Sequence, residues 1–171
     1  MLQPTVRRTW APKGRTPVLK SWDRHDRLSV TAAITVSPAR HRLGLYWRLQ
    51  RSNVRAPDTM RFIRELRRAT GKRLLVILDR LNAHRSAARL LRADTTDASP
   101  FSACRIERLP AYAPELDPVE HVWGHTKHDD LANYIPEDIN ALAVDLDTSL
   151  AHTSTDQALL RGFFRHAKLK L

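Results

Sequence analysis

The chain has 171 residues, of which 42% are hydrophobic and 27% charged, with five Gly and 10 Pro. This composition excludes a collagen-like or low-complexity chain, and no apolar run reaches the roughly 18 residues that a membrane span needs. The first residues contain no apolar segment of the kind found in secretory signals. The single cysteine, Cys104, allows neither an internal disulfide nor a thiolate metal cluster, which fits a reducing cytoplasm.

The net charge of +11 is unevenly placed along the chain. Residues 1–92 hold 22 Lys/Arg and five Asp/Glu, whereas residues 93–171 hold seven and 13. The excess predicts a polyanionic partner, most simply nucleic acid, although a basic protein without such a partner is the alternative. The stretch from Asp129 to Asp156 has seven acidic residues and no Lys or Arg. We expect a solvated helical face there, which either avoids DNA or packs against the basic half.

The first half of the chain predicts an arm, a hairpin and a helix. Residues 1–22 are rich in Pro, Arg and Lys and have no period, so we expect an extended arm. Residues 27–36 and 42–49 are β-rich runs around a turn signal at 37–40, which indicates a hairpin. A helix should open at Ala56, with Asp58 as a cap, and end near Ala69, where Gly71 closes it.

The second half alternates apolar runs with helical patterns. Residues 73–78 form a wholly apolar run, typical of a strand buried on both faces, and a helix should begin near Ser86. We expect a polar loop over 94–103, a strand over 104–109, and a helix capped by Asp117 with Pro118 in its first turn, extending to about Asp130. Two further helices should begin near residues 136 and 155. The order predicts a single α/β domain with a mixed sheet.

Two carboxylates stand at element ends, where ligands gather in α/β proteins. Asp79 directly follows the apolar strand, and Glu120 lies in the first turn of the Pro118 helix. Each has a simpler interpretation: Asp79 as a cap for the following turn, and Glu120 as a favourable charge at a helix N-terminus. Taken together in a basic protein, they suit a hard divalent cation held between protein and phosphate oxygens.

Three blocks carry a resemblance to a known family. They are Leu78–His84 (LDRLNAH), Leu109–Trp123 (LPAYAPELDPVEHVW) and Trp10–Pro17 (WAPKGRTP). The chain resembles mariner-type DDE transposases of the bacterial insertion-sequence branch over nearly its whole length, with the blocks in family order. The resemblance implies a ribonuclease H-like mixed sheet flanked by helices. It implies a basic arm over 1–22, a sheet core over 23–130 and C-terminal helices over 131–171.

The resemblance also implies an activity, a cofactor and a site. Members cleave DNA at transposon ends and join it to target DNA, using carboxylates that bind two Mg²⁺ or Mn²⁺ ions. By position, Asp79 is the second catalytic metal ligand and Glu120 the third. Neighbours of this site are expected to be Asn82, His84, Trp123 and Lys127. The expected location is the bacterial cytoplasm, on the nucleoid when bound to DNA, and a homodimer is left open.

The chain departs from the family at its start. The first catalytic aspartate belongs on a central strand just before the Trp10 block, but no Asp or Glu precedes Asp23. The family's N-terminal helix-turn-helix region is also absent. We therefore expect an N-terminally truncated catalytic domain whose missing strand is encoded upstream, in a shifted frame or separately, and only background DNA nicking by the chain alone. The alternative is a catalytically dead remnant that binds DNA non-specifically.

DNA contacts are expected first from the basic arm, because mobile basic arms wrap polyanions readily. Its cations are Arg7, Arg8, Lys13, Arg15 and Lys20. The arginines of the first helix, at positions 61, 64, 67 and 68, are either phosphate contacts or a solvated face. The histidines at positions 121, 125 and 128 are expected to face solvent or DNA rather than to bind zinc.

Overall fold

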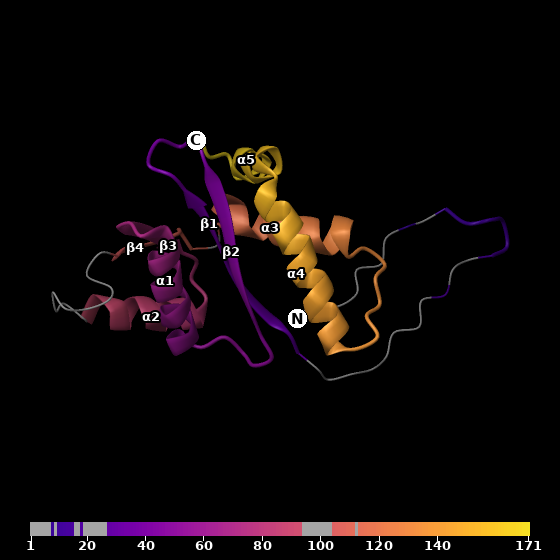
Figure 1. Cartoon of the computed structure of the whole chain (residues 1–171), viewed down its shortest axis with the longest axis horizontal. Coiled ribbons are helices and arrows are strands. Elements are labelled where there is room, and N and C mark those ends of the chain that lie inside the picture. The colour runs from indigo at the N-terminus through magenta and orange to yellow at the C-terminus, as the bar shows by residue number, and fades with distance from the viewer. Residues whose placement is uncertain (1–7, 9, 16–17, 19–26, 94–103, 112) are drawn as a thin grey trace.

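The computed structural model describes residues 8, 10–15, 18, 27–93, 104–111 and 113–171. It contains an α/β arrangement, as the sequence predicts (Figure 1). In chain order the elements are β1 (Ser29–Val36), β2 (Leu43–Gln50), α1 (Ala56–Thr70), β3 (Leu74–Leu78), α2 (Asn82–Ala93), β4 (Cys104–Arg108), a 3₁₀ turn (Pro114–Leu116), α3 (Pro118–His125), a π-helical turn (Thr126–Asp130), α4 (Ile139–Thr155) and α5 (Gln157–His166). The predicted polar loop over 94–103 lies outside the described residues.

The ends of α1 and α3 follow from local chemistry. Gly71 closes α1 with φ at 62°, a left-handed conformation that costs glycine little. The prediction of Asp58 as the cap was inexact: Arg55 occupies the cap position, and Asp58, three residues later, accepts a hydrogen bond from the Arg55 backbone N–H at 3.0 Å. Asp117 does cap α3, because its Oδ1 accepts from the Val119 N–H at 3.0 Å.

The strands form two separate ladders instead of one mixed sheet. β1 and β2 pair antiparallel, with Ser29 opposite Gln50 and Val36 opposite Leu43. β3 and β4 pair in parallel, with Leu74 beside Cys104. Among the described strands, β1 and β3 each pair on one side only.

Apolar burial is divided between two cores, and the β1–β2 hairpin lies between them (Figure 1). The first core joins the hairpin to the C-terminal helices through fully buried side chains such as Leu146, Leu150 and Leu160. The second core joins α1, α2 and the β3–β4 pair around the buried side chains of Ile63, Ala88 and Leu91. Each ladder therefore has helices of its own to bury its apolar face.

The prediction that β3 is buried on both faces was wrong. Val76 and Leu78 pack against the second core, but Leu75 and Ile77 on the opposite face are 61% and 58% exposed. On β4 the same face carries Arg105 and Glu107, which form an ion pair at 3.0 Å. An apolar sequence run records that both faces favour burial, and here the structure covers only one of them.

Polar contacts tie the hairpin to the elements on each side of it. Toward α1, Arg48 Nη1 donates to both carboxylate oxygens of Glu65, at 2.7 and 2.8 Å. At the outer edge of β2, the Gln157 side-chain amide bonds both the N–H and the C=O of Leu43, each at 2.9 Å. The side chain of Gln157 thus replaces a neighbouring strand at this point.

Acidic side chains in the stretch from Asp129 to Asp156 cap helices and accept hydrogen bonds from nearby groups. Asp138 caps α4 by accepting from the N–H groups of Asn140 and Ala141, and Asp156 caps α5. Asp147 contacts the basic half, because its Oδ1 accepts from Trp47 Nε1 at 2.7 Å. In the part of the chain that the structure describes, no helix is both long and apolar enough to cross a membrane.

The position of the first core predicts which side chains of α4 can be shortened to alanine without loss of stability. Leu146→Ala removes a side chain with no exposed surface, so we expect a loss of about 2–5 kcal/mol in the free energy of unfolding. Val144→Ala on the same helix removes a side chain that is 63% exposed and should change it by less than about 0.5 kcal/mol. Urea unfolding measures both, and equal losses would contradict the assigned core.

Candidate active site

A pocket of about 160 Å³ opens at the carboxyl ends of β3 and β4. Its lining comes from three segments of the chain: the residues after β3, the residues after β4, and the entry to α3. The lining residues are Asp79, Arg80, Leu109, Pro110, Ala113, Pro114, Asp117 and Glu120. The structure therefore brings together the two carboxylates that the sequence singles out, and adds a third, Asp117.

Asp79 is held in place through one of its two oxygens. Its Oδ1 accepts a hydrogen bond from the Leu81 backbone N–H at 2.9 Å and also contacts His84 Nδ1. The hydrogen bond from His84 is the main reason that the pKa of Asp79 lies below its ordinary value. Asp79 thus supports the turn before α2, as its simpler interpretation predicts, while Oδ2 accepts no hydrogen bond from the described residues.

The pKa values of Asp117 and Glu120 are raised, in the opposite direction to that of Asp79. Burial raises the pKa of Asp117, and the charge of Asp79 adds to the effect. Burial also raises the pKa of Glu120, with further contributions from the charges of Asp117 and Asp79. The pocket therefore gathers negative charge that its own cations do not fully balance, although Lys127 and His121 act in the other direction on Glu120.

The wall of the pocket is tied together by the backbone. Arg80 Nε donates to the Leu109 carbonyl at 3.0 Å, and the Leu109 N–H donates to the Leu78 carbonyl at 2.9 Å. These bonds extend the β3–β4 pairing beyond the strands and hold the side chain of Arg80 at the wall of the pocket. Sequence reasoning missed Arg80 and Asp117 as pocket residues. The sequence signals that point to them are the position of Arg80 directly after Asp79 and the position of Asp117 three residues before Glu120.

The predicted neighbours of the site lie at different distances from it. His84 contacts Asp79 directly, whereas Asn82 is exposed at the first turn of α2 and is not part of the lining. Trp123 packs against the first core and is not part of the pocket lining. Lys127 lies beyond the end of α3 in the π-helical turn, but its charge still lowers the pKa of Glu120.

The predicted DNA-binding arm is described only in part. Arg8, Lys13 and Arg15 are exposed, and residues 10–15 project away from the two cores (Figure 1). Arg7 and Lys20 lie outside the described residues.

The histidines of α3 differ from expectation. His125 is only 22% exposed and forms ion pairs with Asp129 and Asp130, and the buried Nε2 of His121 faces protein. His128 is exposed, as expected.

The comparisons with known proteins decide the family. The model of the DDE superfamily endonucleases matches residues 1–142. The chain belongs to this family. A crystal structure titled the Mos1 Strand Transfer Complex matches with a TM-score of 0.60 and 16% sequence identity. The match covers 98% of this chain and 48% of that one, so this chain spans about half the length of that relative. No curated protein sequence matches the chain significantly.

The likeness of fold confirms the predicted ribonuclease H-like architecture, and the family match confirms the resemblance read from the three sequence blocks. Endonucleases of the DDE superfamily generally use divalent metal ions. The oxygen donors of the pocket fit such an ion, since Mg²⁺ is commonly held by one or two carboxylates together with water and phosphate oxygens. Within the described ranges, no three His, Cys, Asp or Glu side chains form a ready-made ligand set.

The raised pKa of Glu120 predicts that the chain gives up stability at its pocket. Ionised Glu120 is disfavoured in the folded protein, so Glu120→Gln should raise the free energy of unfolding at pH 7. We expect a gain below about 1 kcal/mol, because the side chain is exposed and solvent screens its charge. The gain should shrink as the pH falls through the raised pKa of folded Glu120 and vanish below 4.5, the ordinary value, where the side chain is protonated in both the folded and the unfolded protein.

Thermal unfolding at pH 7 and pH 4 measures this difference. Glu115→Gln provides the matched control, since Glu115 is exposed and does not line the pocket. A lower melting temperature for Glu120→Gln at pH 7 would contradict the assigned repulsion.

Proposed function

We propose that this chain is the catalytic domain of a DDE transposase, which cleaves DNA at the ends of an insertion sequence and joins it to target DNA. The observation that supports the proposal is the convergence of Asp79 and Glu120, from separate elements, in one pocket whose lining also includes Arg80. Phosphodiester chemistry needs carboxylates to hold a metal ion and a cation to bind the phosphate, and the pocket offers both.

Each side chain of the pocket has a role in this proposal. Asp79 and Glu120 are the catalytic metal ligands, with Oδ2 of Asp79 available because Oδ1 is already hydrogen-bonded. His84 is a positioning residue that fixes the rotamer of Asp79. Arg80, held by the Leu109 carbonyl, presents its remaining N–H groups to a phosphate oxygen of the scissile strand.

The proposed ions are two Mg²⁺ or Mn²⁺, which when bound activate the attacking hydroxyl and stabilise the leaving oxygen. The pocket residues favour their capture, because a cation between Asp79 and Glu120 relieves the charge repulsion that adds to the effect of burial on the pKa of Glu120. Asp117 caps α3 and adds negative charge at the pocket rim.

A further extended segment completes the site in this proposal. β1 and β3 each offer an open edge among the described strands, and the exposed Leu75 and Ile77 offer an apolar face beside it. A strand inserted between them would join the two ladders into one sheet and bring the first carboxylate of the triad to the pocket. We propose that the segment is encoded upstream, in a shifted frame or separately.

The proposed partner is DNA, at transposon ends and at the target. The exposed Arg8, Lys13 and Arg15 support contact through the basic arm. We propose a single catalytic domain over 1–171 that acts in the bacterial cytoplasm and on the nucleoid. Sedimentation of the protein with and without DNA distinguishes a monomer from the homodimer.

Metal binding provides a test that does not depend on catalysis. Mn²⁺ at about 100 times its dissociation constant should raise the free energy of unfolding by about 2.7 kcal/mol. Asp79→Asn and Glu120→Gln should each remove most of this gain, whereas Glu115→Gln should keep it. Thermal unfolding across a Mn²⁺ titration measures the effect, and an equal gain in all four proteins would refute the proposed ligands.

Cleavage of supercoiled plasmid in Mn²⁺ tests the activity itself. The chain alone should nick at background level, and the chain joined to the upstream-encoded strand should nick well above it. In the joined protein, Asp79→Asn or Glu120→Gln should return nicking to background, because both groups act on the same ions. Joined protein whose nicking is unchanged by both substitutions would exclude catalysis at this pocket.

A further inference from the structure

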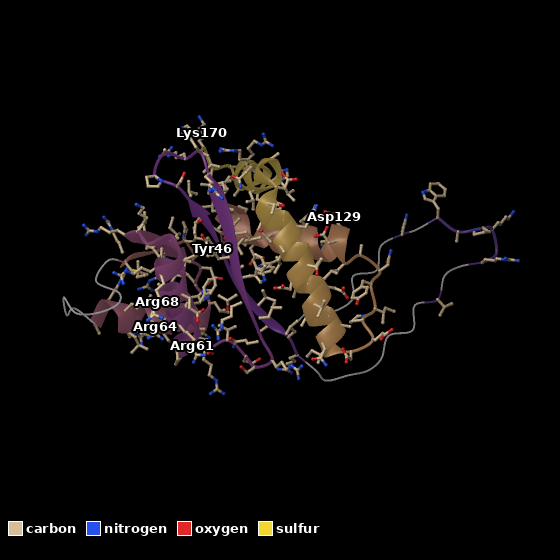
Figure 2. All side chains as sticks on the ribbon, viewed as in Figure 1. Tyr46, Arg61, Arg64, Arg68, Asp129 and Lys170 are labelled. Atoms are coloured by element: carbon tan, nitrogen blue, oxygen red, sulfur yellow. The ribbon has the colours of Figure 1, made fainter. Side chains whose placement is uncertain are left out.

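Helix α1 carries a stripe of three arginines that the proposed catalytic pocket does not use. Arg61, Arg64 and Arg68 are spaced by three and four residues, so they lie on one side of the helix. Figure 2 shows the three side chains grouped along α1, on the side of the molecule that holds the second core. Arg61 and Arg68 are exposed, and Arg64 is partly exposed. We call these residues the arginine stripe.

The acidic residues near the arginine stripe are engaged elsewhere. Glu65 is bound by Arg48 of the hairpin through both of its oxygens. Asp58 accepts from the Arg55 N–H, and Arg61 acts on its carboxylate only through its charge. Arg64 and Arg68 form no ion pair with any described residue. The stripe therefore keeps most of its positive charge available to a ligand.

The surroundings extend the same charge. Residues 56–93 hold 10 Lys/Arg and only three Asp/Glu, and all three acids have the local partners described above. α2, which packs with α1 around the second core, has no acidic residue and exposes Arg85 and Arg89. A solvated helix face usually mixes both signs of charge, so this composition favours an anionic ligand.

We propose that the arginine stripe binds the phosphate backbone of double-stranded DNA, as a second contact surface beside the pocket. The stripe spans seven residues of helix, or about 10 Å, which matches about three phosphates of one strand at 3.4 Å of helix axis each. Guanidinium groups suit this contact because they bind phosphate oxygens in pairs. The surface reads no sequence, since backbone contacts position a protein without specifying bases.

The stripe and part of the pocket belong to the same half of the molecule. Only residues 71–73 join α1 to β3, and the two elements pack around the second core. The pocket opens after β3, so a duplex bound to the stripe lies on the half of the molecule that carries Asp79. This inference rests on the proposed function, in which DNA is the substrate.

The test measures the salt dependence of binding to a fluorescent 30-base-pair duplex. The stripe variant combines Arg61→Gln, Arg64→Gln and Arg68→Gln. The control variant loses three cations at the C-terminus, through Arg165→Gln, Lys168→Gln and Lys170→Gln. Figure 2 shows Lys170 at the upper edge of the view and the stripe at the lower left, so equal charge is removed from a different surface. Circular dichroism and thermal unfolding establish that both variants are folded.

The stripe variant should flatten the slope of log affinity against log salt by up to about 2.7, and the control variant should keep the wild-type slope. Equal slopes for the stripe variant and the wild type would overturn this inference while leaving DNA as the partner. Wild-type protein that fails to bind the duplex at low salt would overturn the proposed function as well. Polyglutamate that competes as well as DNA of equal charge would also overturn the inference, in favour of a general anion surface.

Discussion

The division of apolar burial into two cores is the constraint on which the rest of the structure depends. Asp79 belongs to the second core, because it follows β3, whereas Glu120 belongs to the first, because α3 packs there. The separation of the two carboxylates is therefore set by the contacts between cores and by the Pro-rich segment before α3. Arg48 and Glu65 form one such contact, because they join the hairpin to α1.

Electrostatics in the molecule follow the same division. The first core presents acids that mostly cap helices or accept hydrogen bonds, as Asp138, Asp147 and Asp156 do. The second core presents arginines whose acidic neighbours are occupied. The pocket lies where the two meet, with like-charged carboxylates opposed by few cations. Such a site loses stability in exchange for affinity toward a cation and a phosphate, which is common at catalytic centres.

Local chemistry made much of the fold predictable from the sequence. Gly71, Asp117 and Pro118 determine helix ends through their own backbone preferences, so α1 ends and α3 begins near the predicted residues. α2 begins at Asn82, four residues before the predicted Ser86. Asp79 and Glu120 stood out by their positions and by motif, and the structure places both in the lining of one pocket. The exposure of Leu75 and Ile77 could not be predicted, because an apolar run looks the same whether one face or both are covered. The Arg80 side chain bonds the Leu109 carbonyl, a contact distant in sequence that local patterns do not reveal.

The amide of Gln157 gives the hairpin two unlike sides. At Leu43 it occupies both backbone groups that a neighbouring strand would use, so the outer side of β2 is blocked there against further pairing. The inner sides of β1 and β3 have no such block among the described residues. Among the described strands, a further strand should therefore pair at β1 or β3 more readily than at the outer edge of β2, so the hairpin favours strand addition from one side only.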